Sequence, residues 1–139
     1  MTAGDEAIAG HHHSCYFPPM LAVPKIPSRM TLNEFLAWAP GDSQMWQLVD
    51  GRPEAMAPAN RTHGAIQGEM GGLIRDHLRQ HHSPCSLIVT PGVVPRVHSD
   101  MNFRIPDLAV TCSGYQTEEA AITDPVLIVE ILSPSNQAE

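Results

Sequence analysis

Three short runs rich in valine, isoleucine and leucine fill much of the second half of the chain and follow a longer stretch with helical periodicity. The runs are CSLIVTPGVVPRV at 85–97, FRIPDLAVTC at 103–112 and PVLIVEIL at 125–132. Their length and composition favour β-strands, and the last run, apolar except for Glu130, is expected to be buried on both faces. Strands that follow a long helix in this order predict a mixed α/β layer structure.

Apolar residues recur at steps of three and four between Thr62 and about His82, which predicts an amphipathic helix. Those residues are Ile66, Met70, Leu73, Ile74 and Leu78. Four glycines interrupt the same stretch, and each costs up to about 1 kcal/mol relative to alanine in a helix interior. We therefore expect this helix to pack closely against a sheet.

A capping box and a turn dipeptide predict two elements upstream of that helix. Thr31 and Glu34 have the S/T-x-x-E spacing, so a short helix is expected to start there. Asp50 and Gly51 lie between two strand-like runs, which is typical of a tight β-hairpin. Pro53 confines the second of these strands to a sheet edge, because proline cannot donate a ladder hydrogen bond.

At 139 residues the chain has the length of one domain with one core. We interpret residues 1–29 as a disordered leader, because they contain four prolines between 18 and 27 and lack periodicity, and residues 30–139 as the folded domain. The chain stops seven residues after Leu132, so we expect this domain to be incomplete at its C-terminus. The cytoplasm is the default compartment, since no secretory signal or apolar stretch of ~20 residues is present.

Composition argues against several kinds of site. Cys15, Cys85 and Cys112 lie far apart and form no CxxC pair, so we interpret them as reduced, partly buried thiols rather than as disulfide or zinc ligands. The net charge of −7 opposes loose, charge-driven binding to nucleic acid. Lys25 is the only lysine, and beyond residue 29 there are six arginines and thirteen acidic residues.

Asp107 and Glu130 are the two acidic residues that lie against strand-like apolar sequence. A carboxylate at the mouth of a buried strand costs desolvation free energy unless a cation, a proton or hydrogen bonds compensate it. If the two strands are neighbours, the carboxylates can meet at one end of the sheet. Such a pair suits Mg²⁺, which takes one or two carboxylates and fills its remaining positions with water and substrate phosphate. The metal would then generate the attacking hydroxide and stabilise the pentacoordinate phosphate.

A structural alternative to this metal site stays open at this point. Asp107 then ends a turn, and Glu130 forms a buried ion pair with an arginine, for which Arg104 and Arg96 are candidates. The histidines at the end of the predicted helix, His77, His81 and His82, have the i, i+4 spacing of a zinc site but lack an HExxH arrangement. We interpret them as a solvated helix end, where histidine suits the negative pole of the helix dipole.

The segment RIPDLAV, followed 23 residues after its Asp by VEILSPS, resembles the two half-motifs of the PD-(D/E)XK nuclease superfamily, and in particular the Uma-type family of restriction endonucleases. WQLVDGRPEAMAP resembles the hairpin of that family, and RTHGAIQGEMGGLI resembles its long helix, which begins near a histidine. The likeness covers roughly residues 30 to 135, in the order of the family. It implies a restriction-endonuclease-like sheet flanked by helices and a metal-dependent endonuclease that acts on DNA.

The resemblance also implies roles for single residues. Asp107 and Glu130 match acidic metal ligands and would hold Mg²⁺ or Mn²⁺. His63 matches the histidine at the helix start, where it would orient a phosphate or a metal-bound water, or would only cap or pack the helix. Asp50 matches the Asp of the hairpin turn, for which a structural role is expected.

Two departures from the family pattern bear on activity. Gln47 replaces an acidic residue of the hairpin, and the lysine of the second half-motif falls at Leu132. Because residues 30–139 contain no lysine, an arginine must supply any cation that the chemistry requires, and arginine replaces a compact point charge poorly. The alternative function is therefore a catalytically inactive, truncated nuclease-like fold that acts as a binding module or remnant. The resemblance also suggests a homodimer, since cutting both strands of a duplex suits a two-fold pair.

Overall fold

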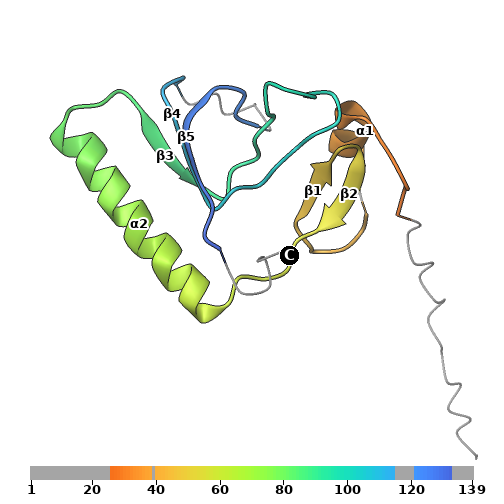
Figure 1. Cartoon of the computed structure of the whole chain (residues 1–139), viewed down its shortest axis with the longest axis horizontal. Coiled ribbons are helices and arrows are strands. Elements are labelled where there is room, and N and C mark those ends of the chain that lie inside the picture. The colour runs from red at the N-terminus through yellow and green to blue at the C-terminus, as the bar shows by residue number, and fades with distance from the viewer. Residues whose placement is uncertain (1–25, 39, 115–120, 133–139) are drawn as a thin grey trace, which may run out of the picture.

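The computed structural model describes residues 26–38, 40–114 and 121–132, so most of the predicted leader and the C-terminal residues 133–139 lie outside the described ranges (Figure 1). The elements in chain order are α1 (Leu32–Ala37), β1 (Trp46–Val49), β2 (Arg52–Ala55), α2 (Arg61–Gln80), β3 (Ser86–Val89), β4 (Leu108–Thr111) and β5 (Pro125–Val129). This order of a short helix, a hairpin, a long helix and three strands confirms the predicted mixed α/β class. The division into leader and domain stays a prediction.

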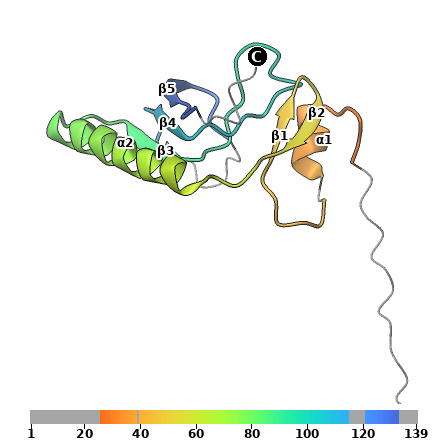
Figure 2. The ribbon, with the colours of Figure 1, turned by 60° about the horizontal axis from the view of Figure 1, so that its bottom comes forward.

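The strands form two antiparallel sheets. β1 and β2 pair as a hairpin beside α1, while β3, β4 and β5 form a second sheet in that order, with β4 in the centre. Figure 2 shows α2 lying along one face of the second sheet, and Figure 1 places the hairpin and α1 on the other side of the molecule. Neither described helix is both long and apolar enough to cross a membrane.

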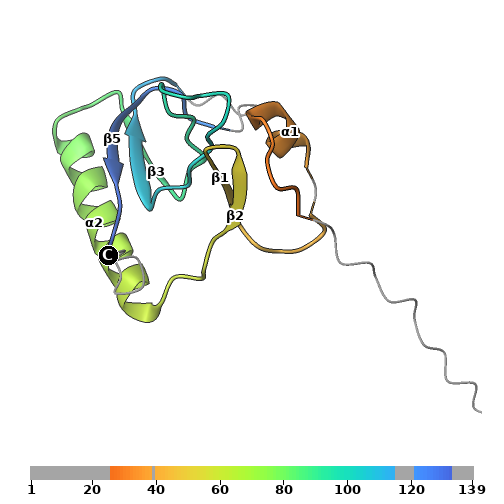
Figure 3. The same cartoon turned by 45° about the vertical axis from the view of Figure 1, so that its right-hand side comes forward.

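One extended segment joins the two sheets. The backbone groups of Phe103 and Leu48 exchange hydrogen bonds of 2.7 and 3.0 Å, and those of the next residue, Arg104, exchange bonds of 2.8 Å with Val93. The main buried cluster forms at this junction and contains Met30, Phe35, Leu48 and Phe103. Figure 3 shows β1 and β2 between α1 and the second sheet, so the hairpin is tied to the sheet that carries the acidic half-motifs.

The hairpin turn has the conformation that its sequence predicts. Asp50 and Gly51 both have positive φ, 47° and 81°, as a type I′ turn requires. The buried Asn102 accepts a hydrogen bond from the Asp50 N–H and donates one to the Asp50 side chain, which supports the structural role expected for this acid. Within the described ranges β2 pairs only with β1, so Pro53 lies in an edge strand as predicted.

Both helices begin at side-chain caps. In α1 the Thr31 N–H donates to the Glu34 carboxylate at 2.7 Å and the Glu34 N–H donates back to the Thr31 hydroxyl, which confirms the predicted capping box. In α2 the cap is Asn60, whose side chain accepts from the His63 N–H at 2.9 Å. Close helix–sheet packing occurs at Gly71 alone among the four glycines. A Cβ there would lie 3.6 Å from leucine side chains of β3 and β4, whereas the other three positions are open.

The prediction that the last strand is buried on both faces is wrong. Within the described ranges β5 lies at the edge of its sheet, where Val126, Leu127 and Ile128 are 64%, 43% and 48% exposed. All four residues of the central strand β4 are buried instead. An apolar run indicates a strand but not its place in the sheet, because burial on both faces depends on strand order.

The interpretation of Cys85 and Cys112 as reduced thiols is also wrong, since the two form a disulfide. They are 27 residues apart in the sequence, yet they directly extend the register in which Ser86 pairs with Thr111 across β3 and β4. Sequence spacing could not reveal this pair, because it is created by the antiparallel alignment of two strands separated by a long connection. Cys15 lies outside the described residues.

Gly51→Ala is expected to destabilise the fold more than Gly41→Ala. Both glycines have positive φ, which costs an L-residue about 1–2 kcal/mol. A Cβ at Gly41 meets nothing within 4 Å, whereas one at Gly51 would lie 2.5 Å from the Met101 methyl and 3.0 Å from Arg29. Both contacts are made by flexible side chains that can move, so we expect an additional loss of about 1 kcal/mol for Gly51→Ala, measured by urea unfolding. A smaller loss in Gly51→Ala than in Gly41→Ala would contradict the close contact.

The disulfide predicts a thiol count. In a Cys15→Ser chain purified without reductant and then denatured, we expect no thiol that reacts with a chromogenic disulfide reagent, because Cys85 and Cys112 are paired. Reduction before the assay is expected to release both thiols. Two reactive thiols in the unreduced chain would contradict the disulfide.

Candidate active site

The antiparallel register of β4 and β5 brings the two acidic residues of the half-motifs together. Leu108 of β4 pairs with Val129 of β5. Asp107 directly precedes Leu108 and Glu130 directly follows Val129, so in this antiparallel register the two acids occupy facing positions at one end of the sheet. This confirms that the two strands are neighbours, which was the condition for a shared carboxylate site. The prolyl residue before Asp107 is fully buried, so the acid stands at the mouth of the central strand.

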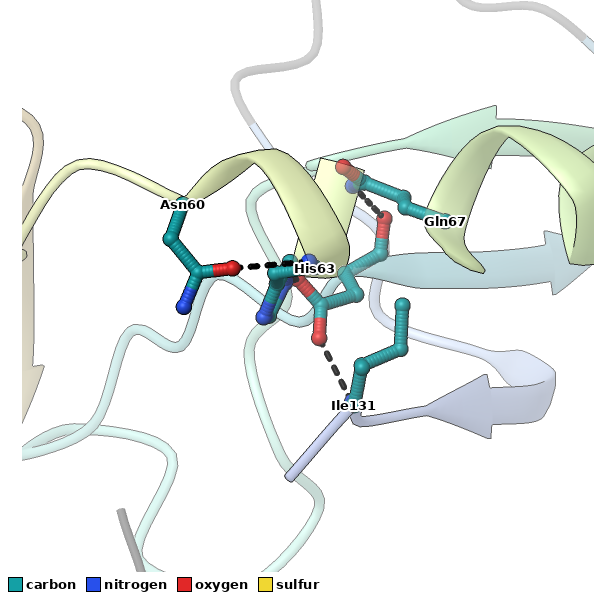
Figure 4. A network of polar contacts seen from close by, with 5 residues as sticks. Asn60, His63, Gln67 and Ile131 are labelled. Carbon is teal, nitrogen blue, oxygen red and sulfur yellow. Dashed lines mark hydrogen bonds and ion pairs between the residues drawn. The ribbon is translucent and has the colours of Figure 1, made fainter. Parts of the chain in front are cut away.

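The carboxylate of Asp107 is held from two sides. His63 of α2 lies with its Nε2 2.5 Å from Oδ1, and the backbone N–H of Ile131 donates to Oδ2 at 2.6 Å. Figure 4 shows His63 projecting from the first turns of α2 and Ile131 approaching from the end of β5. The side chains of the acid and the histidine are only 14% and 13% exposed, and hydrogen bonds to a charged acceptor are strong in such surroundings.

The backbone carbonyl of Asp107 is held as firmly as its side chain. It accepts hydrogen bonds from Gln67 Nε2 at 2.8 Å and from the Thr90 N–H at 3.0 Å. Gln67 lies four residues after His63, on the same face of α2, so one helix face binds both the carboxylate and the carbonyl of this residue (Figure 4). The sequence analysis missed Gln67, although its i+4 spacing from His63 is the signal that could have found it.

The electrostatics of Glu130 reflect its acidic neighbour. Partial desolvation of its carboxylate and the negative charge of Asp107 both raise the pKa of Glu130, although the residue as a whole is exposed. The backbone of Asp107 and the positive charges of His63 and Arg104 partly offset this rise in pKa. Two carboxylates that repel each other at a sheet end are a site that a cation stabilises.

The structural alternatives are only partly realised. Within the described ranges the ion pair formed is His63–Asp107, and neither Arg104 nor Arg96 reaches Glu130 to form the alternative pair. His77 and His81 lie with ring centroids 4.4 Å apart near the end of α2, and no three His, Cys, Asp or Glu side chains of the described chain cluster as metal ligands. A cation between the two carboxylates would therefore take its other ligands from water and substrate.

Of the other residues singled out in the sequence, Gln47 and Asp50 lie away from this sheet end and Leu132 adjoins it. Gln47 is on β1, where it pairs across the hairpin with Glu54, and Asp50 is in the hairpin turn. Leu132 is 73% exposed and lines a cavity with His63 and Ile131. The position of the expected motif lysine therefore adjoins the site but carries no charge.

Residues 32–139 match the model of the Uma2 family, described as "Putative restriction endonuclease". The uncharacterized protein slr1290 of Synechocystis sp. is 28% identical over 111 residues, a match that covers 79% of this chain and 57% of that protein. The chain therefore spans little more than half the length of this curated relative. The observed α/β arrangement is compatible with the restriction-endonuclease-like fold of the matched family.

Asp107→Asn is expected to lower the pKa of Glu130. The variant removes the neighbouring negative charge that raises this pKa but retains the backbone and most of the desolvation. The measurement is a carboxyl ¹³C NMR titration of the metal-free protein. Asp124→Asn is a matched control, because the exposed Asp124 is hydrogen-bonded to Ser113 and does not contribute to the shift of Glu130. An unchanged Glu130 pKa in Asp107→Asn would contradict the proximity of the two carboxylates.

Proposed function

We propose that this chain, which belongs to the Uma2 family of the restriction-endonuclease-like superfamily, is a metal-dependent endonuclease that hydrolyses phosphodiester bonds of DNA. The observation that carries the proposal is the pairing of Asp107 and Glu130 at one end of β4 and β5. Family membership supports a nuclease, and the carboxylate pair supports the metal-dependent chemistry.

The donor set fits a hard divalent cation. Asp107 and Glu130 would hold Mg²⁺ or Mn²⁺, because carboxylate oxygens are the ligands that these ions prefer and because their mutual repulsion is relieved by positive charge. The hydrogen bonds from His63 and Ile131 leave lone pairs on both oxygens of Asp107. When bound, the metal supplies a Lewis acid that activates water and offsets the negative charge that develops at phosphorus.

The surrounding residues fix the geometry of this site. His63 holds one oxygen of Asp107 and thereby sets the plane of the carboxylate, while Gln67 fixes the backbone of the same residue. Both act through Asp107, so in this proposal they are positioning residues. Because both residues belong to α2, this one helix orients both the carboxylate and the backbone of Asp107.

The remaining parts of the proposal concern substrate, assembly and location. DNA is the proposed substrate, recognised by local positive charge, because the net charge of −7 disfavours non-specific attraction. We also propose a homodimer, which would place one site on each strand of a duplex, and a cytoplasmic location.

A non-catalytic binding module is the second candidate function. It is favoured by Gln47 in place of an acidic residue and by the lack of lysine from residue 30 to 139. A fold that keeps the carboxylate pair but lacks the basic side chain of the family pattern could bind nucleic acid without cutting it. Cleavage and metal binding, measured on the same preparation, separate the two functions.

In a plasmid nicking assay, the wild-type chain is expected to cleave with Mg²⁺ or Mn²⁺ and not with a chelator. Asp107→Ala and Glu130→Gln are expected to abolish cleavage, since each removes a proposed ligand. His63→Gln is expected to weaken metal affinity about 10–100-fold, as loss of a partner that orients a ligand does. Glu69→Gln removes the same charge as Glu130→Gln, but at an exposed position of α2, and should cleave like the wild type.

Titration calorimetry with each metal tests the same proposal without catalysis. Binding is expected for the wild type and Glu69→Gln, and its loss is expected for Asp107→Ala. The endonuclease proposal fails if the wild type binds neither metal, or if Asp107→Ala cleaves as fast as the wild type. Metal binding without cleavage would favour the binding module.

A further inference from the structure

A cavity of about 420 Å³ opens beside Glu130, and it shares no lining residue with the cavity that His63 and Leu132 line. Its polar lining comes from Arg96, Arg104 and Glu130, and most of the rest is apolar. Cavities of this size and mixed character bind small ligands or single groups of larger ones. The cavity therefore adjoins the carboxylate pair and presents two guanidinium groups to whatever enters it.

Neither arginine forms a direct ion pair in the described part of the chain. No acidic side chain there lies within ion-pairing distance of Arg96 or Arg104, although the charge of Arg96 acts on Asp124 from farther away. Arg104 and Glu130 line the same cavity without pairing. A guanidinium that lines a cavity without a direct ion pair is a binding group for an anion of fork-like geometry, such as phosphate.

The backbone of Arg104 is fixed relative to the site. Its backbone exchanges two 2.8 Å hydrogen bonds with Val93, and it lies three residues before Asp107 on the segment that leads into β4. The side chain is half-buried, whereas that of Arg96 is exposed. Of the two arginines, Arg104 is therefore the better preorganised for a fixed contact near the acidic pair.

We propose that Arg104, assisted by Arg96, binds a phosphate of the DNA backbone next to the bond that is cut, an inference that rests on the proposed endonuclease function. Arg104 then supplies the positive charge that no lysine between residues 30 and 139 can supply. The position where the second half-motif would place a lysine is Leu132, which lines a different cavity, beside His63. The proposed cation therefore lines another cavity than the one at the motif position.

The cavity lining around Arg104 suits both the phosphate and the sugar of a DNA backbone. Glu130 repels phosphate, so the anion is expected to bind at the arginine end of the cavity rather than against the carboxylate. The apolar part of the lining, which includes Pro106, Pro125 and Ile128, can contact the deoxyribose of the same nucleotide. Contacts of this kind hold the backbone without reading its sequence.

The test measures binding without catalysis. A short fluorescein-labelled DNA duplex is titrated with protein in Ca²⁺, which replaces Mg²⁺ so that the duplex is not cut, and anisotropy is followed over a series of salt concentrations. Arg104→Gln is expected to weaken binding about tenfold. It should also reduce the slope of log affinity against log salt by about 0.9, the value for one lost phosphate contact.

Two further variants control for charge and folding. Arg104→Lys keeps the positive charge and the backbone pairing with Val93, so its salt slope should match that of the wild type. Arg52→Gln removes an equal charge from an exposed position of β2 in the other sheet and should change affinity less than twofold. Thermal unfolding of each variant establishes that the binding differences are not losses of fold.

The inference is overturned if Arg104→Gln keeps the wild-type salt slope, or if Arg52→Gln loses as much affinity as Arg104→Gln. Plasmid cleavage that persists in that case leaves the endonuclease function standing. Conversely, a wild type that binds the duplex through Arg104 and does not cleave overturns the endonuclease function, and Arg104 is then a phosphate contact of a binding module rather than a neighbour of a cut bond. A wild type that does not bind the duplex overturns both.

Discussion

Asp107 is the residue on which the second half of the fold depends, because four hydrogen bonds converge on it from three directions. Its carboxylate joins His63 of α2 to the backbone that leaves β5, and its carbonyl joins Gln67 of α2 to the loop that follows β3. A residue with these contacts is fixed before any ligand arrives. Its carboxylate is therefore preorganised, and the cost of ordering it is included in folding rather than in binding.

The same arrangement concentrates negative charge. Asp107 and Glu130 face each other across β4 and β5, and each lies near one basic side chain: His63 bonds to Asp107, and Arg104 lines a cavity with Glu130. The positive groups reduce the repulsion between the two carboxylates without forming an ion pair with Glu130 in the described ranges. A balance of this kind leaves room for a divalent cation, since a direct arginine–Glu130 pair would occupy the ligand atoms.

Local features of this fold could be predicted from sequence because their physical causes lie within a few residues. The capping box at Thr31 and the positive φ of Asp50 and Gly51 depend only on neighbouring groups. The pairing of Asp107 with Glu130 could be expected only on the condition that the strands are neighbours, which the register supplies.

Features that depend on strand order or register could not be predicted in this way. The apolar residues of β5 are exposed because that strand is at an edge, and an apolar run has the same sequence at an edge as in the centre. Gln67 and Arg104 lie inside the matched segments but occupy no position to which the family pattern gives a role, and the packing of α2 brings Gln67 to Asp107. The site was thus predictable in its acids and not in the groups that position them.

The disulfide between Cys85 and Cys112 lies at the end of β3 and β4 that is remote from Asp107. Besides lowering the entropy of the unfolded chain, it constrains how the two strands align. A slip of one residue between two strands turns every side chain to the opposite face and shifts every backbone partner. The Thr90 N–H meets the carbonyl of Asp107 only in the observed alignment of β3 with β4. The disulfide therefore keeps β3 and β4 in this register and preserves the geometry of a site that it does not touch.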